Sequence, residues 1–428
     1  MSAEITLVKG RRVWDSRGQP TVETEIHLSD GAVGRSIAPA GASTGSAEAV
    51  DRRDGGHAFG GLDVMGAVDA VSNEIAEHLQ GRDAFDQVDI DQAMINLDGT
   101  SNRSRLGGNA LVATSMAVAH AAAASAGLPL WRFLGGDGQN YKMPLPEVQI
   151  FGGGAHAGRR VDVQDFMVIA VGAQSYEQAL EWTAEVYQNA GKLMSDVGRL
   201  RGVADEGGFW PDFDSNEEAL DFLVRAIEAA GFTPGHDISI SLDIAATDFG
   251  QNGQYRLAAD NKVVDADGLS EILLRWVDKY PIVSIEDPMG EDDADAMAKF
   301  TTAAGSKVEV VADDFICTSA EKIKNARLIG ACNTALIKPN QAGTLTEAKA
   351  ALDAARSAGW ESIVSARSGE SEDVTIVHLA VGWGVKQLKV GSFARSERMA
   401  KWNEGLRITE NIVNNVSDLH LRSSFPWD

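Results

Sequence analysis

Short apolar runs alternate with amphipathic stretches over the last two thirds of this 428-residue chain. The runs are typical of buried strands, and the stretches have the period of helices that cover a sheet. The eight runs are Glu147–Phe151, Phe166–Val171, Ile238–Leu242, Ile282–Ile285, Val308–Val311, Thr334–Ile337, Ser362–Val364 and Gln387–Val390. The helical stretches between the later runs are Ser270–Lys279, Asp292–Thr302, Ser319–Ala326, Thr344–Ala358 and Glu372–Val381.

Eight strands that alternate mostly with helices predict an α/β fold in which the strands close into a βα barrel. An open, doubly wound sheet is the alternative. Such a sheet would carry a Gly-rich nucleotide fingerprint after its first strand. The sequence lacks that fingerprint, so the pattern favours the barrel.

The first third of the chain has a different pattern. Three β-type segments separated by Gly- and Asp-rich turns predict an antiparallel meander, and helical periodicity follows them. The segments are Ile5–Val13, Thr21–Leu28 and Ala32–Ile37, and the clearest helices are Val64–Leu79 and Ala110–Ala126. We therefore predict an α+β cap domain over residues 1–136 and a barrel domain over residues 137–428.

The composition excludes several classes of protein. A formal net charge of −24 argues against nucleic acid as a partner, because phosphate binding needs a basic surface. Met1–Gly10 lacks the apolar run of a signal peptide, and no segment approaches the roughly 20 apolar residues that span a membrane. The two cysteines are too few for a secreted disulfide framework. We expect a cytoplasmic protein with no membrane or nucleic-acid partner.

Charged side chains follow the predicted barrel strands. Asp243, Glu286 and Asp313 end three successive strands, and Lys338 and Lys389 belong to later ones. The carboxyl ends of barrel strands converge on one mouth, where active sites of this architecture lie. A single strand-end aspartate is more simply a helix N-cap, but three in succession, followed by two lysines, predict a site.

Three neighbouring carboxylates repel each other unless a cation neutralises them. Hard oxygen ligands without His or Cys favour Mg²⁺ over zinc. Lys338 beside such a cation would be disfavoured as an ammonium, so we expect its pKa to fall towards that of a general base. The predicted chemistry is removal of a proton from a carbon next to a metal-held carboxylate.

Three loops add weaker signals. Val203–Gly208 is an acidic turn that contains Glu206, and Gly152–His156 is a Gly-rich loop that ends in a histidine. Pro39–Gly45 consists of small residues with the hydroxyls of Ser43 and Thr44, which suits a mobile lid over a phosphate. Each segment alone is more simply an ordinary turn or loop.

Together these segments resemble the enolase family, from the N-terminus to about Ile408. The similar motifs are Asp15–Gly18 with Pro20–Glu23, Gly41–Gly45, Leu97–Thr100, Asp205–Gly208, Ser284–Asp287, Lys338–Gln341, Arg367–Glu370 and Lys389–Ser392. The resemblance implies an α+β cap, a barrel whose first strands break the strict alternation, and a dimer. It also implies a small phosphorylated carboxylate as the substrate.

The resemblance further implies a role for each matching residue. Asp243, Glu286 and Asp313 would hold Mg²⁺, Lys338 would take the C2 proton, and Lys389 would hold the substrate carboxylate. Glu206 would assist the leaving group at C3, and Ser43 would belong to the lid. The other implied site residues, for catalysis or substrate binding, are His156, Gln164, Asp165, Arg367 and Ser368.

Several positions depart from the usual family pattern. Ala366 stands where a histidine is usual, Asp165 where a glutamate is usual, and Gly152 and Ala155 where larger polar residues are usual. Arg159 and Arg160 replace uncharged residues. We expect these changes to widen the phosphate end for a bulkier, more anionic substrate.

These departures favour a specialised relative, similar to the carboxyphosphonoenolpyruvate synthases of phosphonate biosynthesis, over an ordinary enolase that converts 2-phosphoglycerate to phosphoenolpyruvate. A catalytically retired binding protein is a third alternative, but it should have lost the carboxylates or the lysines. A different acid-sugar dehydratase would lack the lid and phosphate motifs.

Overall fold

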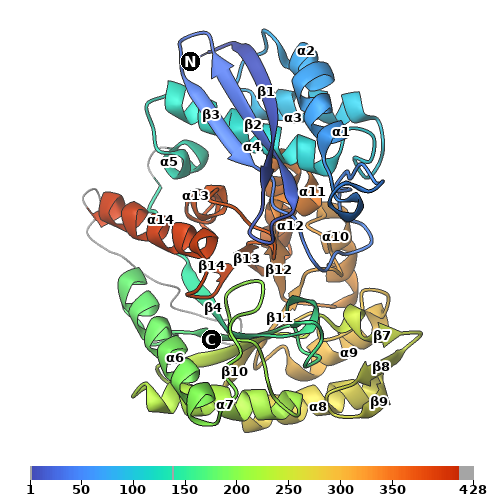
Figure 1. Cartoon of the computed structure of the whole chain (residues 1–428), viewed down its shortest axis with the longest axis vertical. Helices are drawn as coiled ribbons and strands as arrows, with labels where there is room; N and C mark the ends of the chain where they lie inside the picture. Colours follow the sequence, from blue (N-terminus) through green and yellow to red (C-terminus); the bar gives the residue numbers. More distant parts are fainter. Residues whose placement is uncertain (1, 137–138, 414–428) are drawn as a thin grey trace.

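The computed structural model describes residues 2–136 and 139–413. A cap domain lies above a closed barrel, with the N-terminal strands at the top of the view (Figure 1). The predicted fold class is thereby confirmed. The predicted domain boundary at residues 136 and 137 adjoins residues 137–138, which lie outside the described residues.

The cap domain contains the predicted meander. Strands β1 (Ile5–Trp14), β2 (Pro20–Leu28) and β3 (Val33–Ile37) pair antiparallel in the order β1-β2-β3. Helix α4 (Gly108–Ser125) packs against β2 and β3 and is buried along most of its length. Its alanines allow this close packing, because they place little bulk between the helix and the sheet.

The remaining cap helices are shorter. The predicted helix at Val64–Leu79 is divided into α1, a π-helical turn and α2. Helices α3 and α5 were absent from the prediction. The bounds are α1 Met65–Ala70, the π-helical turn Val71–Ile75, α2 Ala76–Leu79, α3 Gln87–Asp98 and α5 Leu130–Gly135.

Eight strands close the barrel in the order β10-β11-β12-β13-β14-β4-β5-β6. Each strand overlaps one of the predicted runs. Strand β5 is antiparallel to both β4 and β6, whereas the other neighbouring pairs are parallel. The bounds are β4 Leu145–Gly152, β5 Asp165–Ile169, β6 Ser239–Asp243, β10 Ile282–Glu286, β11 Glu309–Ala312, β12 Thr334–Ile337, β13 Glu361–Ser365 and β14 Gln387–Gly391.

Helices surround this barrel, and two consecutive helices, α6 and α7, separate β5 from β6. The sequence prediction lacked both of them. The bounds are α6 Tyr176–Asp196, α7 Asn216–Ala229, α8 Ala266–Lys279, α9 Ala294–Ala304, α10 Ala320–Ile329, α11 Pro339–Ala342, α12 Leu345–Ser357, α13 Thr375–Gly382 and α14 Ser396–Val413. A small sheet follows β6, with β7 Gly250–Gln251, β8 Gln254–Leu257 and β9 Lys262–Asp265. No helix in the described ranges is long and apolar enough to cross a bilayer.

The cap is fixed to the barrel beside its mouth. Ala40 and Gly369 exchange two backbone hydrogen bonds of 2.9 and 2.8 Å. Asp91 of α3 accepts the backbone N–H of Thr346 in α12 at 2.9 Å. The first contact holds the loop after β3 beside the barrel mouth, and the second fixes α3 to α12.

Candidate active site

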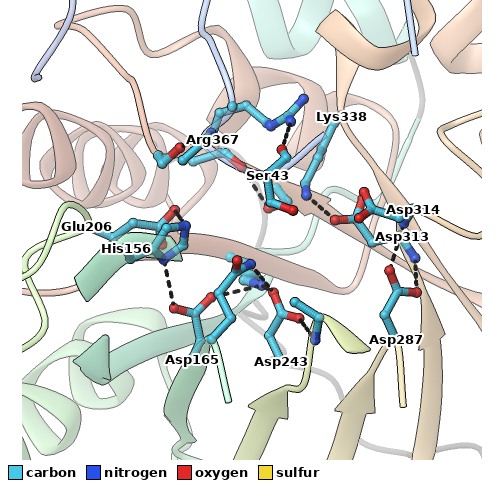
Figure 2. A pocket seen from close by; sticks show the side chains of 18 residues that line it. Ser43, His156, Asp165, Glu206, Asp243, Asp287, Asp313, Asp314, Lys338 and Arg367 are labelled. Carbon is cyan, nitrogen blue, oxygen red and sulfur yellow. Dashed lines mark hydrogen bonds and ion pairs between the residues drawn. The ribbon is translucent and has the colours of Figure 1, made fainter. Parts of the chain in front are cut away.

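A small cavity of about 20 Å³ lies at the carboxyl ends of the barrel strands, beneath the loop that follows β3. All the predicted site residues except Glu286 line it. Figure 2 shows His156, Asp165 and Glu206 on one side of the cavity and Lys338 with Asp313 on the other. The fold therefore brings together side chains from the cap, from all eight barrel strands or the loops next to them, and from the 203–208 turn.

Two of the predicted metal ligands lie side by side in the barrel. Asp243 of β6 and Glu286 of β10 are register partners, and both are buried. Lys389 of β14 places its Nζ 2.9 Å from Asp243 Oδ2 and 2.8 Å from Glu286 Oε2. Burial lowers the pKa of Lys389, but these carboxylates raise it well above its ordinary value. Lys389 is therefore a cation in this site.

The cluster of predicted metal ligands contains three carboxyl groups but only two lysines, Lys338 and Lys389. Burial and the neighbouring charge of Asp243 raise the pKa of Glu286 well above its ordinary value. Glu286 Oε1 is buried and has no hydrogen-bond partner among the described residues. An oxygen-only donor set with an unpartnered oxygen has the chemistry that hard divalent cations prefer. That Asp243, Glu286 and Asp313 hold one cation together stays a prediction.

Asp313 also belongs to a second acidic group. Ligand oxygens of Asp287, Asp313 and Asp314 lie within 4.8 Å of one another. Both carboxylate oxygens of Asp287 accept backbone N–H groups, from Asp313 at 2.9 Å and from Asp314 at 2.8 Å. Asp287 thus holds the turn after β11 and orients Asp313, a role that the strand-end pattern alone did not predict.

Lys338 follows β12 and donates a hydrogen bond from Nζ to Asp313 Oδ2. Gln341 donates to the other oxygen of Asp313 at 2.9 Å. Burial favours the neutral amine of Lys338, but Asp313 and Glu286 favour the ammonium more strongly and raise its pKa. The expected fall in this pKa applies to Lys338 beside a bound cation and stays a prediction; in the chain without a cation, the neighbouring carboxylates raise the pKa.

His156 lies between two carboxylates on the opposite side. Its Nδ1 is 3.2 Å from Asp165 Oδ1, and its Nε2 is 3.9 Å from Glu206 Oε1. Burial lowers the pKa of His156, but the two carboxylates raise it more, to about 8. Burial raises the pKa of Glu206, whereas Lys389 and His156 overcome burial and lower that of Asp165. Glu206 therefore retains a proton more readily than Asp165 does.

Arg367 and Ser368, the predicted phosphate contacts, lie together after β13. The Arg367 guanidinium donates to Glu48 Oε2 at 2.9 Å and to the backbone oxygen of Ser43 at 2.8 Å. Ser43 Oγ lies 3.3 Å from Asp248 Oδ1. The sequence analysis missed Glu48, although its position a few residues beyond the predicted lid motif could have indicated it. Glu48 occupies the guanidinium fork that a substrate phosphate would need.

Only two of the unusual positions, Ala366 and Asp165, line the cavity. A Cβ atom on Gly152 would lie 2.7 Å from Ala204 Cβ, so that glycine relieves crowding elsewhere. Arg159 donates to the backbone oxygen of Asp248 at 2.9 Å. Gly152, Ala155, Arg159 and Arg160 are not among the residues that line the cavity, and Arg160 pairs with Asp212 at 3.4 Å. Their expected effect on the phosphate end stays a prediction.

Comparison with family models covers nearly the whole chain. Residues 5–134 match the model described as "Enolase, N-terminal domain". Residues 140–420 match the model described as "Enolase, C-terminal TIM barrel domain".

Proposed function

Because this chain belongs to the enolase family, we propose that it is a Mg²⁺-dependent lyase acting on 2-phosphoglycerate or a close analogue. It removes the C2 proton and forms an enolpyruvate product. The observation that carries the proposal is that Lys338 and Glu206 lie on two sides of one cavity, with buried carboxylates and Lys389 between them. This arrangement suits a base and an acid that act on adjacent carbon atoms.

Mg²⁺ would supply the charge that stabilises the extra negative charge on the substrate carboxylate once the C–H bond breaks. Asp243, Glu286 and Asp313 would hold it, and Lys389 would bind the same substrate carboxylate. If Asp313 binds the cation, its attraction for the Lys338 ammonium weakens, and Lys338 loses its proton more readily. A neutral Lys338 amine is then the base.

Lys338 Nζ accepts the C2 proton, and the electron pair of the broken C–H bond moves to form the C2–C3 double bond. For 2-phosphoglycerate, hydroxide departs from C3 with a proton from Glu206, so that water leaves. The raised pKa of Glu206 supports its role as this acid. His156 and Asp165 hold Glu206 within a buried charge network.

The substrate phosphate would bind Arg367 and Ser368 under the loop that contains Ser43, with Gln164 contributing to the same wall. Glu48 must release Arg367 for this contact to form. Guanidinium forks bind phosphate and carboxylate oxygens in the same bidentate manner, so the exchange of one for the other is chemically simple. The proposed assembly is a homodimer or a higher homo-oligomer.

Within this function, we favour a specialised relative similar to carboxyphosphonoenolpyruvate synthase. Ala366 lines the cavity where the family usually has a histidine, and Asp165 replaces a longer acid. Both changes remove bulk next to the reacting atoms. An ordinary enolase is the alternative. A retired binding protein is disfavoured, because the three carboxylates and both lysines are present and buried together.

Two measurements test the proposal. In D₂O with Mg²⁺, the chain should exchange the C2 proton of 2-phosphoglycerate, and Lys338→Ala should lose about 10²–10⁴-fold in that rate. Asp313→Ala should lose Mg²⁺ binding. Absence of exchange, or full activity after chelation, would contradict the function. Turnover of 2-phosphoglycerate at about 10 s⁻¹ or more would instead identify an ordinary enolase.

A further inference from the structure

Gln149 of β4 joins two parts of the site that are far apart in the sequence. Its side chain is buried, with a relative exposure of 1%. Its Nε2 donates to Asp165 Oδ1, and its Oε1 accepts the backbone N–H of Gly208 at 2.8 Å. One amide therefore connects β5 to the turn that contains Glu206.

Two glycines make room for this amide. A Cβ atom on Gly208 would lie 2.4 Å from Gln149 Oε1, which is closer than a real Cβ contact. A Cβ atom on Gly152 would lie 3.2 Å from both polar atoms of the Gln149 amide. The space around the amide is thus fitted to it, and neither glycine tolerates a side chain without displacing Gln149.

The contact extends from Gln149 to the acid–base group. Asp165 Oδ1, which accepts from Gln149, also lies 3.2 Å from His156 Nδ1. Asp165 Oδ2 lies 3.3 Å from Lys389 Nζ. Gly208 is two residues from Glu206 in a tight turn, so the bond to its N–H restrains the direction of that acid. Lys338 lies on the other side of the cavity, where it contacts Thr318 and Asp313.

We propose that Gln149 is a positioning residue for the leaving-group side of the reaction, where it fixes Glu206 relative to Asp165 and His156. The inference rests on the proposed function. An amide suits this place because it donates to a carboxylate on one side and accepts an N–H on the other. A carboxylate could not donate to ionised Asp165, and an aliphatic side chain would leave the Gly208 N–H without this acceptor and remove one donor from Asp165.

The test separates the two sides of the reaction. Gln149→Leu should reduce enolpyruvate formation from 2-phosphoglycerate by about 10²-fold, the cost of a misplaced catalytic group. C2 exchange, which depends on Lys338, should stay within about threefold of the unmodified chain. Gln149→Glu keeps the acceptor for Gly208 but loses the donor to Asp165. It should show the same selective loss, and it serves as the second variant if the leucine variant does not fold.

Gln87→Leu is the matched control. Gln87 bridges Asp91 Oδ1 at 3.0 Å and the Ser115 backbone oxygen at 3.1 Å in the cap domain, away from the cavity. This variant should change neither rate. Enolpyruvate formation within threefold of normal in a folded Gln149→Leu, or an equal loss of both rates, would overturn the inference. An unmodified chain that exchanges no C2 proton would instead contradict the proposed function itself.

Discussion

Replacing Glu286 with glutamine should have opposite consequences with and without a cation. In the chain without a cation, burial and the neighbouring acids raise the pKa of Glu286 well above its ordinary value. A carboxyl group whose folded-state pKa is raised opposes folding when it is ionised, at any pH above its unfolded-state value. Glutamine has the same shape and no charge. We therefore expect Glu286→Gln to be as stable as the unmodified chain, or more stable, in chelator at pH 7.

One lost contact limits this gain. Glu286 Oε2 is 2.8 Å from Lys389 Nζ, and a neutral amide oxygen would attract that ammonium less strongly. Lys389 keeps Asp243 at 2.9 Å and Asp165 at 3.3 Å, so its charge stays paired. The lost attraction is therefore smaller than that of a buried lysine left without a partner, which would be strongly destabilising.

Magnesium should reverse the order of stability. At a free concentration 100 times its dissociation constant, a cation bound only to the folded chain adds about 2.7 kcal/mol to the free energy of unfolding. If Glu286→Gln weakens binding about 100-fold, the same concentration adds only about 0.4 kcal/mol. Urea unfolding with and without Mg²⁺ measures both values, and isothermal titration of the folded chain measures the affinity.

Glu361→Gln is the control for this experiment. Glu361 pairs with Lys386 at 2.6 Å at the opposite end of the barrel, and both side chains are partly exposed. Such a pair contributes about 0–1 kcal/mol, and its loss should leave the full response to Mg²⁺. The reasoning fails if Glu286→Gln is clearly destabilised in chelator and still gains as much from Mg²⁺ as the unmodified chain.

Three further changes test other parts of the site. Ala366→His should fill space at the cavity wall and raise the rate with 2-phosphoglycerate relative to a bulkier phosphonate substrate. If the ratio of kcat/KM for these two substrates does not change, Ala366 is not a determinant of specificity. Glu48→Gln should release the Arg367 fork and lower KM about tenfold, equivalent to about 1.4 kcal/mol, and an unchanged or higher KM would show that Glu48 does not compete with substrate. The pKa of His156 is raised from 6.5 to about 8, so its ion pairs should stabilise the chain fully below about pH 6.5 and lose this effect as the pH rises through 8. His156→Gln should show no such loss of stability in thermal unfolding. Identical pH profiles for the variant and the unmodified chain would refute the assignment.

The periodic pattern of the sequence determined the barrel, the meander and the strand-end acids. Apolar runs can be identified locally, because side-chain burial on a strand follows from its own sequence. Asp243 and Lys338 were recognised as site residues for the same reason: the carboxyl ends of barrel strands meet at one mouth, whatever the details of the loops. The clustering of these charged side chains at the barrel mouth was therefore predictable.

The tertiary structure decided which partners each charged group contacts. Glu48 occupies Arg367 from 319 residues away in the sequence, and Gln149 spans 59 residues to reach Gly208. Neither contact follows from local periodicity, because each depends on how a loop packs across the barrel mouth. The raised pKa of Lys338 in the chain without a cation has the same origin, since it depends on the contact with Asp313 and not only on the identity of the strand-end residues.

The unusual positions show the same division. Sequence comparison by motif identified Ala366, Gly152 and Arg160 as departures of equal weight, but only the first lines the cavity. Gly152 packs against Ala204, and Arg160 pairs with Asp212 outside the site. A residue next to a site residue in the chain points to the other face of a strand or away along a loop. Proximity in sequence therefore limits where a side chain lies, while the packing of distant segments determines what it contacts.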